Sequence, residues 1–252
     1  MIVQFCSDLH LEFPKNKAFL KKNPIPAKGD ILVLAGDILP FKVQDEHNDF
    51  WDYLSNSFQY VYWVPGNHEY YYSDVSEYSH ATYQKLRDNV ILVNNTSVIH
   101  NNVRFIFTTL WSDISPENQF MIQYRMSDFR VIRNGDDIFT PQKFNQLHSE
   151  SLKFLTTEIA KSDVEKTVVV SHHVPTYLNY PEKYKGDTLN EAFAVELKHV
   201  IENSGIDYWI FGHHHQNKCD FKIGKTRLLS SQLGYVHHNE HLEFNANSLF
   251  TI

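Results

Sequence analysis

The chain has 252 residues, 42% hydrophobic residues and no repeat or low-complexity tract. A chain of this length buries one sizeable core, so we expect a single domain over residues 1–252. The formal net charge is -7, and the sequence contains no run of Lys and Arg residues. This balance argues against a protein that holds nucleic acid mainly by neutralising phosphates, because such proteins carry clustered positive charge.

The cysteine content and the N-terminus favour a protein of the cytoplasm. Only Cys6 and Cys219 occur, so we expect no disulfide framework and a reducing compartment. The N-terminus has no basic start, no long apolar stretch and no small-residue cleavage site. No segment approaches the roughly 20 apolar residues that span a bilayer, so we expect no membrane association. The sequence leaves the oligomeric state open.

Short β-rich runs alternate with longer amphipathic stretches along most of the chain. This alternation is typical of a layered α/β fold with helices covering a largely parallel sheet. Several of the runs are apolar throughout, as strands covered on both faces should be. The expected strands are Ile2–Cys6, Ile31–Ala35, Tyr60–Val64, Val90–Val93, Arg104–Leu110, Thr167–Ser171 and Asp207–Phe211.

The region 112–134 is the least regular part of the chain. Ser115-Pro116 is expected to open a helix that continues through Met126. Asn134-Gly135 is typical of a turn. We interpret the region as a lobe inserted over one end of the sheet.

The second half of the chain carries further helix and strand signals. Thr140-Pro141 predicts a helix start, with Thr as the N-cap and Pro in the first turn. The stretch Asn190–Asn203 places apolar residues on one helical face and is expected to form a helix. The shorter segments Lys218–Ile223, Thr226–Ser231 and Leu249–Ile252 are expected to be antiparallel strands at a sheet edge or in a second sheet.

Polar residues follow several of these strands directly, at the point where each strand ends. Asp8 and His10 come two residues apart, which projects both side chains to one side if the chain stays extended. The other groups are Gly36-Asp37, Gly66-Asn67-His68-Glu69, His172-His173 and Gly212-His213-His214-His215. Ligands bind at the carboxyl edge of an α/β sheet. Carboxylate, imidazole and amide oxygen without thiolate suit Mn(II), Fe or Zn in a reactive site.

Taken together and in order, these groups resemble the five motifs of the calcineurin-like metallophosphoesterases. The resemblance spans roughly residues 2 to 231 and rests on Ser7-Asp8-Leu9-His10, Gly36-Asp37, Gly66-Asn67-His68-Glu69, His172 and Gly212-His213-His214-His215. It implies a four-layer α/β/β/α sandwich, with two mixed sheets flanked by helices. It also implies a di-metal site at the carboxyl edge of the sheets.

The resemblance further implies how two divalent or trivalent metal ions are shared among these residues. The first metal would take Asp8, His10 and His215, the second Asn67, His172 and His213, and Asp37 would bridge both. A shared carboxylate and a bridging hydroxide are needed because two cations held about 3.5–4 Å apart repel each other. The sequence does not decide between Mn, Fe and Zn.

Two histidines beside the expected ligands are ambiguous. Only one of His172 and His173 should point into the site, and we favour His172 because the family motif takes the first His after the strand. His214 lies between two ligands, so its side chain should face away from the metals. It would then be solvent-exposed or hydrogen-bonded, with substrate contact as the alternative.

The expected chemistry is hydrolysis of a phosphoester by a metal-bridging hydroxide, which forms because the metals lower the pKa of water to about 7. His68 is adjacent to ligand Asn67 without being a ligand, so it suits the task of protonating the leaving group. Glu69 would orient the imidazole of His68, or would be a loop carboxylate in water.

Contacts with the rest of the substrate are less well defined. Tyr71 lies in a run of three tyrosines after the catalytic loop, and Trp111 ends an expected strand. Each would form an aromatic wall of the site or belong to the core. Arg125 and Arg130 flank Asp128, and either would grip a non-reacting phosphate oxygen or form an ordinary ion pair.

The favoured function is hydrolysis of phosphomonoesters or small phosphodiesters. A nuclease is the alternative within the enzymes, and the acidic charge argues against it. A protein phosphatase is a further possibility. A non-catalytic interaction module of the same fold is the alternative from another class, and the intact ligand set with His68 argues against that one.

Overall fold

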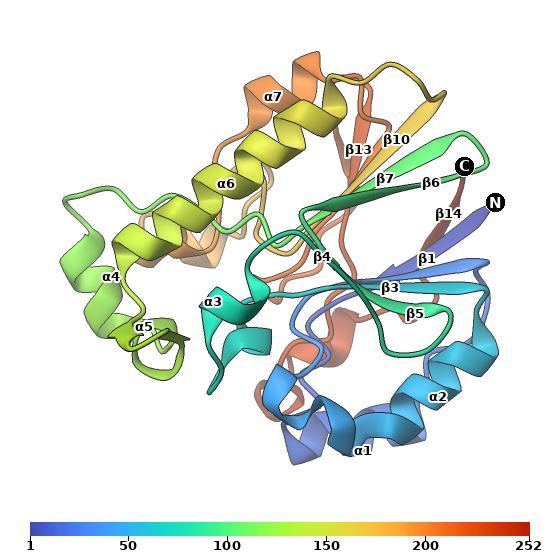
Figure 1. Cartoon of the computed structure of the whole chain (residues 1–252), viewed down its shortest axis with the longest axis horizontal. Coiled ribbons are helices and arrows are strands. Elements are labelled where there is room, and N and C mark those ends of the chain that lie inside the picture. The colour runs from blue at the N-terminus through green and yellow to red at the C-terminus, as the bar shows by residue number, and fades with distance from the viewer.

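Two six-stranded mixed sheets, described over residues 1–252 by a computed structural model, pack face to face with helices outside both (Figure 1). The first sheet has the order β14-β1-β2-β3-β5-β4. Its central strands are parallel and its two edge strands are antiparallel to their neighbours. The bounds are β1 Ile2–Cys6, β2 Ile31–Ala35, β3 Tyr60–Val64, β4 Thr82–Lys85, β5 Val90–Asn94 and β14 Leu249–Thr251.

The second sheet has the order β12-β13-β11-β10-β7-β6 and follows the same plan. Its four central strands are parallel, and β6 and β12 pair antiparallel at the edges. The bounds are β6 Thr96–His100, β7 Val103–Thr108, β10 Lys166–Ser171, β11 Tyr208–Ile210, β12 Phe221–Ile223 and β13 Thr226–Leu229. The predicted sandwich with two mixed sheets is confirmed.

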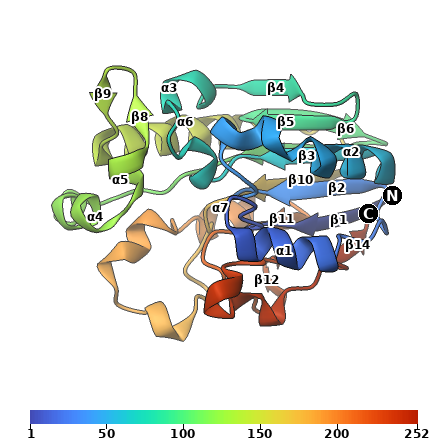
Figure 2. The same cartoon turned by 90° about the horizontal axis from the view of Figure 1, so that it is seen from below.

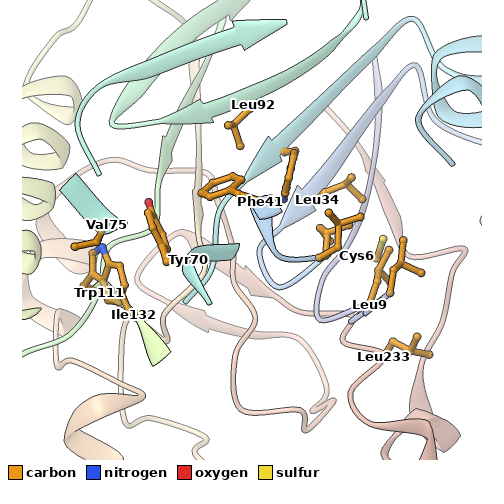
Figure 3. Packing of buried hydrophobic residues seen from close by; sticks show 14 of the residues in the cluster. Cys6, Leu9, Leu34, Phe41, Tyr70, Val75, Leu92, Trp111, Ile132 and Leu233 are labelled. Carbon is orange, nitrogen blue, oxygen red and sulfur yellow. The ribbon is translucent and has the colours of Figure 1, made fainter. Parts of the chain in front are cut away.

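Alternate residues of the central strands enter different cores, which explains why these strands are apolar throughout. In β2, Ile31 and Val33 face the second sheet, whereas Leu32 and Leu34 face the outer helices. Figure 3 shows part of the outer core, where Leu34 lies near Cys6 and Phe41. The period of two places one residue set on each face of a strand.

Helices cover the outer face of each sheet (Figures 1 and 2). α1 (Pro14–Lys22) and α2 (Asn48–Ser57) cover the first sheet, and α6 (Pro141–Ile159) and α7 (Lys198–Asn203) cover the second. α6 begins as predicted, because the Thr140 side chain accepts a hydrogen bond of 3.2 Å from the backbone N of Lys143. No helix combines the length and the apolar character that crossing a membrane requires.

The segment between β7 and α6 lies beyond one end of the sheets (Figures 1 and 2). It contains α4 (Gln119–Arg125), α5 (Asp128–Val131) and the hairpin of β8 (Arg133–Asn134) and β9 (Asp137–Ile138). The predicted turn at Asn134-Gly135 closes this hairpin, with Gly135 at a φ of 64°. The helix predicted from Ser115 starts later, at Gln119.

The predicted continuous helix over 190–203 is wrong. The chain forms a 3₁₀ turn over Thr188–Ala192 and then the short helix α7. In between, the backbone N of Val195 donates to Val174 O at 3.0 Å, and the N of Leu197 donates to Pro175 O at 2.9 Å. Pairing with a distant loop therefore replaces the helical hydrogen bonds that the apolar spacing suggested.

The antiparallel prediction for the last strands is correct in part. β12 and β14 do pair antiparallel with their neighbours, but β13 also pairs parallel with β11. The C-terminal strands thus extend both sheets.

Candidate metal centre and its cleft

The loops that leave the strands carry the expected ligands in an unusual backbone conformation. Five of these residues have positive φ, namely Asp8 at 56°, His10 at 48°, Asp37 at 54°, His213 at 83° and His215 at 52°. A left-handed backbone costs an L-residue about 1–2 kcal/mol, and such strain clusters at functional sites. Asp8 and His10 do converge as expected, but left-handed turns and not an extended chain bring them together.

The side chains of the expected ligands converge in two groups. The donor atoms of Asp8, His10, Asp37 and His215 all lie within 4.8 Å of one another, and so do those of Asp37, His172 and His213. Asp37 belongs to both groups. The Oδ1 atom of Asn67 lies 3.3 Å from Nε2 of His172.

In the first group, the imidazoles of His10 and His215 face each other through their Nε2 atoms. His10 Nδ1 lies 3.1 Å from Glu12 Oε1, and His215 Nδ1 lies 2.8 Å from Glu240 Oε2. Each Nδ1 therefore donates to a carboxylate, which leaves Nε2 of each neutral ring with a lone pair. These two Nε2 atoms are 3.0 Å apart and buried. Nε2 of His215 also lies 3.3 Å from Asp8 Oδ1, so either a proton shared with Asp8 or a bound cation satisfies it.

The second group repeats this arrangement with backbone partners. His172 Nδ1 lies 3.0 Å from Ala35 O, and His213 Nε2 lies 3.4 Å from Ala192 O. Their other nitrogens face each other at 3.0 Å. Asn67 donates its Nδ2 to Asp128 Oδ1 at 2.8 Å, so its oxygen is left to point inward. Outer hydrogen bonds of this kind orient metal ligands, and the residues fit a pair of metal ions.

The ionisation of the histidines agrees with this fit. Burial lowers the pKa of His215, but hydrogen bonds to Asp8 and Glu240 outweigh it and raise the pKa to about 10. Burial likewise opposes a charge on His172, and the Asp37 carboxylate raises its pKa to about 9. Buried Asp8 and Asp37 thus need positive charge beside them, and metal cations would replace these protons.

Two glycines are required by how closely the ligands approach the loops. A Cβ atom on Gly66 would lie 2.2 Å from Asp37 Oδ1. A Cβ atom on Gly36 would lie 2.2 Å from His172 Nδ1, and the φ of Gly36 is 90°. Only glycine leaves room for the shared carboxylate and the imidazole at these positions.

His68 lies beside the two groups that share Asp37 and belongs to neither. Its backbone N donates to Asp37 Oδ1 at 2.9 Å, and its ring stacks on Tyr71 with centroids 4.0 Å apart. Its Nδ1 lies 3.1 Å from Glu12 Oε1, and its Nε2 lies 3.3 Å from the Tyr235 hydroxyl. Burial lowers the pKa of His68, but the carboxylates of Asp37 and Glu12 outweigh it and raise the pKa above its ordinary value.

Comparison with known proteins identifies the family. The family model described as calcineurin-like phosphoesterase matches residues 1–217. The chain belongs to this family. An uncharacterised protein of Acanthamoeba polyphaga mimivirus is 29% identical over 266 residues, which cover 94% of this chain and 92% of that protein.

A solved structure supports the fold. The phosphopantetheinyl hydrolase of Mycobacterium tuberculosis superposes with a TM-score of 0.65 at 17% identity, covering 93% of this chain and 90% of that one. At this identity the likeness extends to the fold. The two mixed sheets flanked by helices are therefore a fold that this chain shares with that protein.

Within this calcineurin-like site, Glu69 does not contact His68, so the expectation that it orients the imidazole is wrong. Its carboxylate lies behind the ligands, where it accepts hydrogen bonds from the backbone N of Asp37 at 2.9 Å and of Gly66 at 2.6 Å. It also accepts from Ile38 N and from the indole of Trp63. Glu69 thus ties together the loops that follow β2 and β3, and Glu12 is the partner of His68.

A cleft of about 350 Å³ opens above the ligands. Tyr71 lines it, as the sequence suggested. Trp111 does not, because its side chain is 1% exposed and packs beside Val75 and Ile132 in the core (Figure 3). The aromatic-wall interpretation of Trp111 is wrong.

The remaining predicted residues divide between the cleft and its surroundings. Arg125 lines the cleft and forms an ion pair of 3.2 Å with Asp187, whereas Arg130 lies outside the cleft in an adjoining depression. His214 lines the cleft and is buried, and its Nδ1 lies 3.1 Å from Gln232 Nε2. His172, and not His173, lies in the group with Asp37.

Sequence reasoning missed the carboxylates behind the ligands. Glu12 continues the alternation of Asp8 and His10 by two more residues, and this spacing was the available signal. Asp128 stands out in the sequence only by its flanking arginines. Glu240 follows the last motif by many residues, at the start of the 3₁₀ turn Glu240–Glu243, and no local pattern points to it.

Proposed function

We propose that this protein hydrolyses small phosphoesters, monoesters or diesters, in the cleft above Asp37. The observation that carries the proposal is the pair of inward-facing donor groups that share Asp37, with His68 beside them. Two metal ions of Mn, Fe or Zn held by these donors would activate water at neutral pH and polarise the phosphoryl oxygens.

In this proposal His68 protonates the leaving group. Glu12 fixes its Nδ1 at 3.1 Å, so the ring presents Nε2 to the cleft that His68 lines. A donor fixed in this way can give a proton to an oxygen within hydrogen-bond reach of Nε2. The Tyr235 hydroxyl, 3.3 Å from Nε2, would hold the ring until the leaving group takes its place.

The cleft favours a small substrate over a nucleic acid. Asp128, Asp187 and Glu240 line it together with Asp37. A polyanionic strand would bring further phosphates against these carboxylates, whereas a single phosphoester needs only the metals. Nucleic-acid hydrolysis is therefore the less favoured alternative. The location that we propose is the cytoplasm. Cys6 and Cys219 are both free thiols, which is typical of proteins in a reducing compartment.

The first test is activity after metal loading. The chain reconstituted with Mn(II) should hydrolyse a phenyl phosphomonoester and a diester reporter, and Asp37→Asn should lose this activity. If no divalent metal gives the wild-type chain activity above that variant, the non-catalytic interaction module becomes the better interpretation.

The second test addresses His68. We expect His68→Ala to retain its metals and to lose about 10²–10⁴-fold in rate on substrates with poor leaving groups. The loss should be much smaller on activated leaving groups, which need no proton. Equal losses on both kinds of substrate would exclude His68 as the acid.

A further inference from the structure

A shallow depression adjoins the mouth of the cleft. We call this depression the outer hollow. It is lined by Gln123, Tyr124, Arg125, Phe129, Arg130 and Leu189. Arg125 and Leu189 line both the outer hollow and the cleft. The outer hollow therefore lies next to the cleft, on the other side of Arg125 and Leu189.

The outer hollow differs in charge from the cleft and from the chain as a whole. Two arginines and no carboxylate line it. The cleft, in contrast, is lined by the carboxylates of Asp37, Asp128, Asp187 and Glu240 and by the single arginine Arg125. In a chain with a formal net charge of -7, the outer hollow is a local site where an anion is favoured.

Arg130 is held in place and keeps donors free. Its Nη1 donates to Tyr124 O at 2.8 Å, and its Nη2 donates to Ser127 Oγ at 3.2 Å. It forms no ion pair with a carboxylate, and no carboxylate lines the hollow beside it. These two bonds fix the guanidinium at the turn between α4 and α5, and its other N–H donors are left for a ligand.

Arg125 has a partner that an anion can displace. Its Nη1 lies 3.2 Å from Asp187 Oδ1, and both side chains are 41% exposed. Ion pairs of this exposure contribute little stability. Because a guanidinium binds phosphate oxygens through parallel N–H bonds, a phosphate competes well for Arg125.

We propose that the outer hollow binds a second phosphate, carried by the leaving group of the substrate. The inference rests on the proposed phosphoesterase function and narrows its substrates to small molecules with two anionic phosphate groups. Arg125 and Arg130 are then the residues that set this preference.

The kinetic test compares substrates that differ only in the second phosphate. Alkanediol bisphosphates are matched with alkyl monophosphates of equal chain length, and phosphate release is measured with Mn(II)-loaded protein. At the best chain length we expect kcat/KM to be about tenfold or more higher for the bisphosphate. Arg125→Gln and Arg130→Gln should each reduce this ratio several-fold.

Two further variants separate the subsite from general damage. Arg133→Gln removes the same charge from the same segment but lines neither the cleft nor the outer hollow, so the ratio should stay at its wild-type value. Asp187→Asn releases Arg125 from its ion pair. It should therefore raise the ratio of kcat/KM for the bisphosphate to kcat/KM for the monophosphate, a gain that misfolding does not produce. Asn at this position still accepts the hydrogen bond from Leu189 N.

Binding without turnover distinguishes this inference from the proposed function. Calorimetry with an alkane bisphosphonate and the matched monophosphonate should show tighter binding of the bisphosphonate, and Arg130→Gln should reduce the difference several-fold. Bisphosphonate binding that depends on Arg130, in a chain without turnover, would support the subsite and overturn the proposed hydrolysis.

Equal kcat/KM and equal binding for both members of each pair would overturn the subsite while hydrolysis stands. A preference for longer chains regardless of the second phosphate would also overturn it, because the outer hollow would then recognise apolar groups.

Discussion

At the scale of single residues, Glu12 links the two kinds of chemistry in the site. Its Oε1 lies 3.1 Å from His10 Nδ1 and 3.1 Å from His68 Nδ1. Burial raises the pKa of Glu12, but hydrogen bonds with both histidines outweigh it and lower the pKa to about 2. One charged carboxylate therefore orients a metal-ligand candidate and the proposed acid together.

We expect Glu12→Gln to weaken both functions while the fold is retained. The amide keeps the shape but loses the charge that holds protons on the two Nδ1 atoms, so His68 and His10 are less well oriented. The rate on poor leaving groups should fall about 10–100-fold, and metal affinity should fall as well. A series of leaving groups and the bound metal content are the measurements.

The exposed carboxylate Glu46 provides a control, since Glu46→Gln makes the same change away from the cleft. If Glu12→Gln lowers metal content but leaves the dependence on leaving group unchanged, Glu12 supports only His10. Rescue by Glu12→Asp is not expected, because the shorter side chain does not reach both rings.

At the scale of secondary-structure elements, a buried arginine fixes the end of α6 to the second sheet. Arg104 in β7 is 2% exposed, and its guanidinium donates to the carbonyls of Glu158 and Lys161 and to Asp163. The Glu158 carboxylate lies 3.8 Å from Arg104 Nε and accepts from Ser97 Oγ at 2.7 Å. Removing the Glu158 charge would leave buried Arg104 with only the exposed carboxylate of Asp163 as an ionic partner.

Glu158→Gln should destabilise the chain by about 1–3 kcal/mol at pH 7. Burial raises the pKa of Glu158, but hydrogen bonds from Lys161 and Ser97 outweigh it and lower the pKa below its ordinary value. A lowered pKa contributes stability above the unfolded pKa of about 4.3, and this is lost as pH falls through the folded pKa. The difference in urea unfolding between the two proteins should therefore be full at pH 7 and shrink below about pH 4.3.

Glu150 lies on the exposed side of the same helix, and Glu150→Gln should change the unfolding free energy very little. If Glu158→Gln unfolds at the wild-type urea concentration at pH 7, the ionic link does not stabilise α6 on the sheet.

The elements that were predicted well are those whose signal is local. β1, β2 and β3 match their predicted bounds because their apolar runs follow from burial on both faces. The segment 190–203 failed because its hydrogen-bond partners, Val174 and Pro175, lie far away in the sequence. Periodicity describes which residues become buried, and here Leu197 and Ile201 are buried without one continuous helix.

At the scale of the whole molecule, the site is assembled from both sheets. Asp8, Asp37 and Asn67 follow strands of the first sheet, and His172 and His213 follow strands of the second. The expected ligands were predictable because they follow the ends of β1, β2, β3, β10 and β11 within a few residues. The cleft residues Glu240 and Asp187 were not, because they lie at the starts of short 3₁₀ turns far in sequence from the motifs.

Because both sheets contribute to one centre, metal removal should lower the stability of the whole chain. Metal binds the folded state only, so a concentration of one hundred times Kd adds about 2.7 kcal/mol. For a chain of this size that corresponds to a fall of roughly 5–10 °C in Tm when a chelator removes the metals. Differential scanning calorimetry with Mn(II) and after chelation measures the shift.

Asp37→Asn separates binding at this centre from binding elsewhere, since the variant removes the one carboxylate that belongs to both ligand groups. The metal-dependent shift should be much smaller in that variant than in the wild-type chain. A shift of full size in Asp37→Asn would place the bound metal outside this centre. An unchanged Tm in the wild-type chain would mean that the buried histidines keep their protons and that the two sheets are joined without metal.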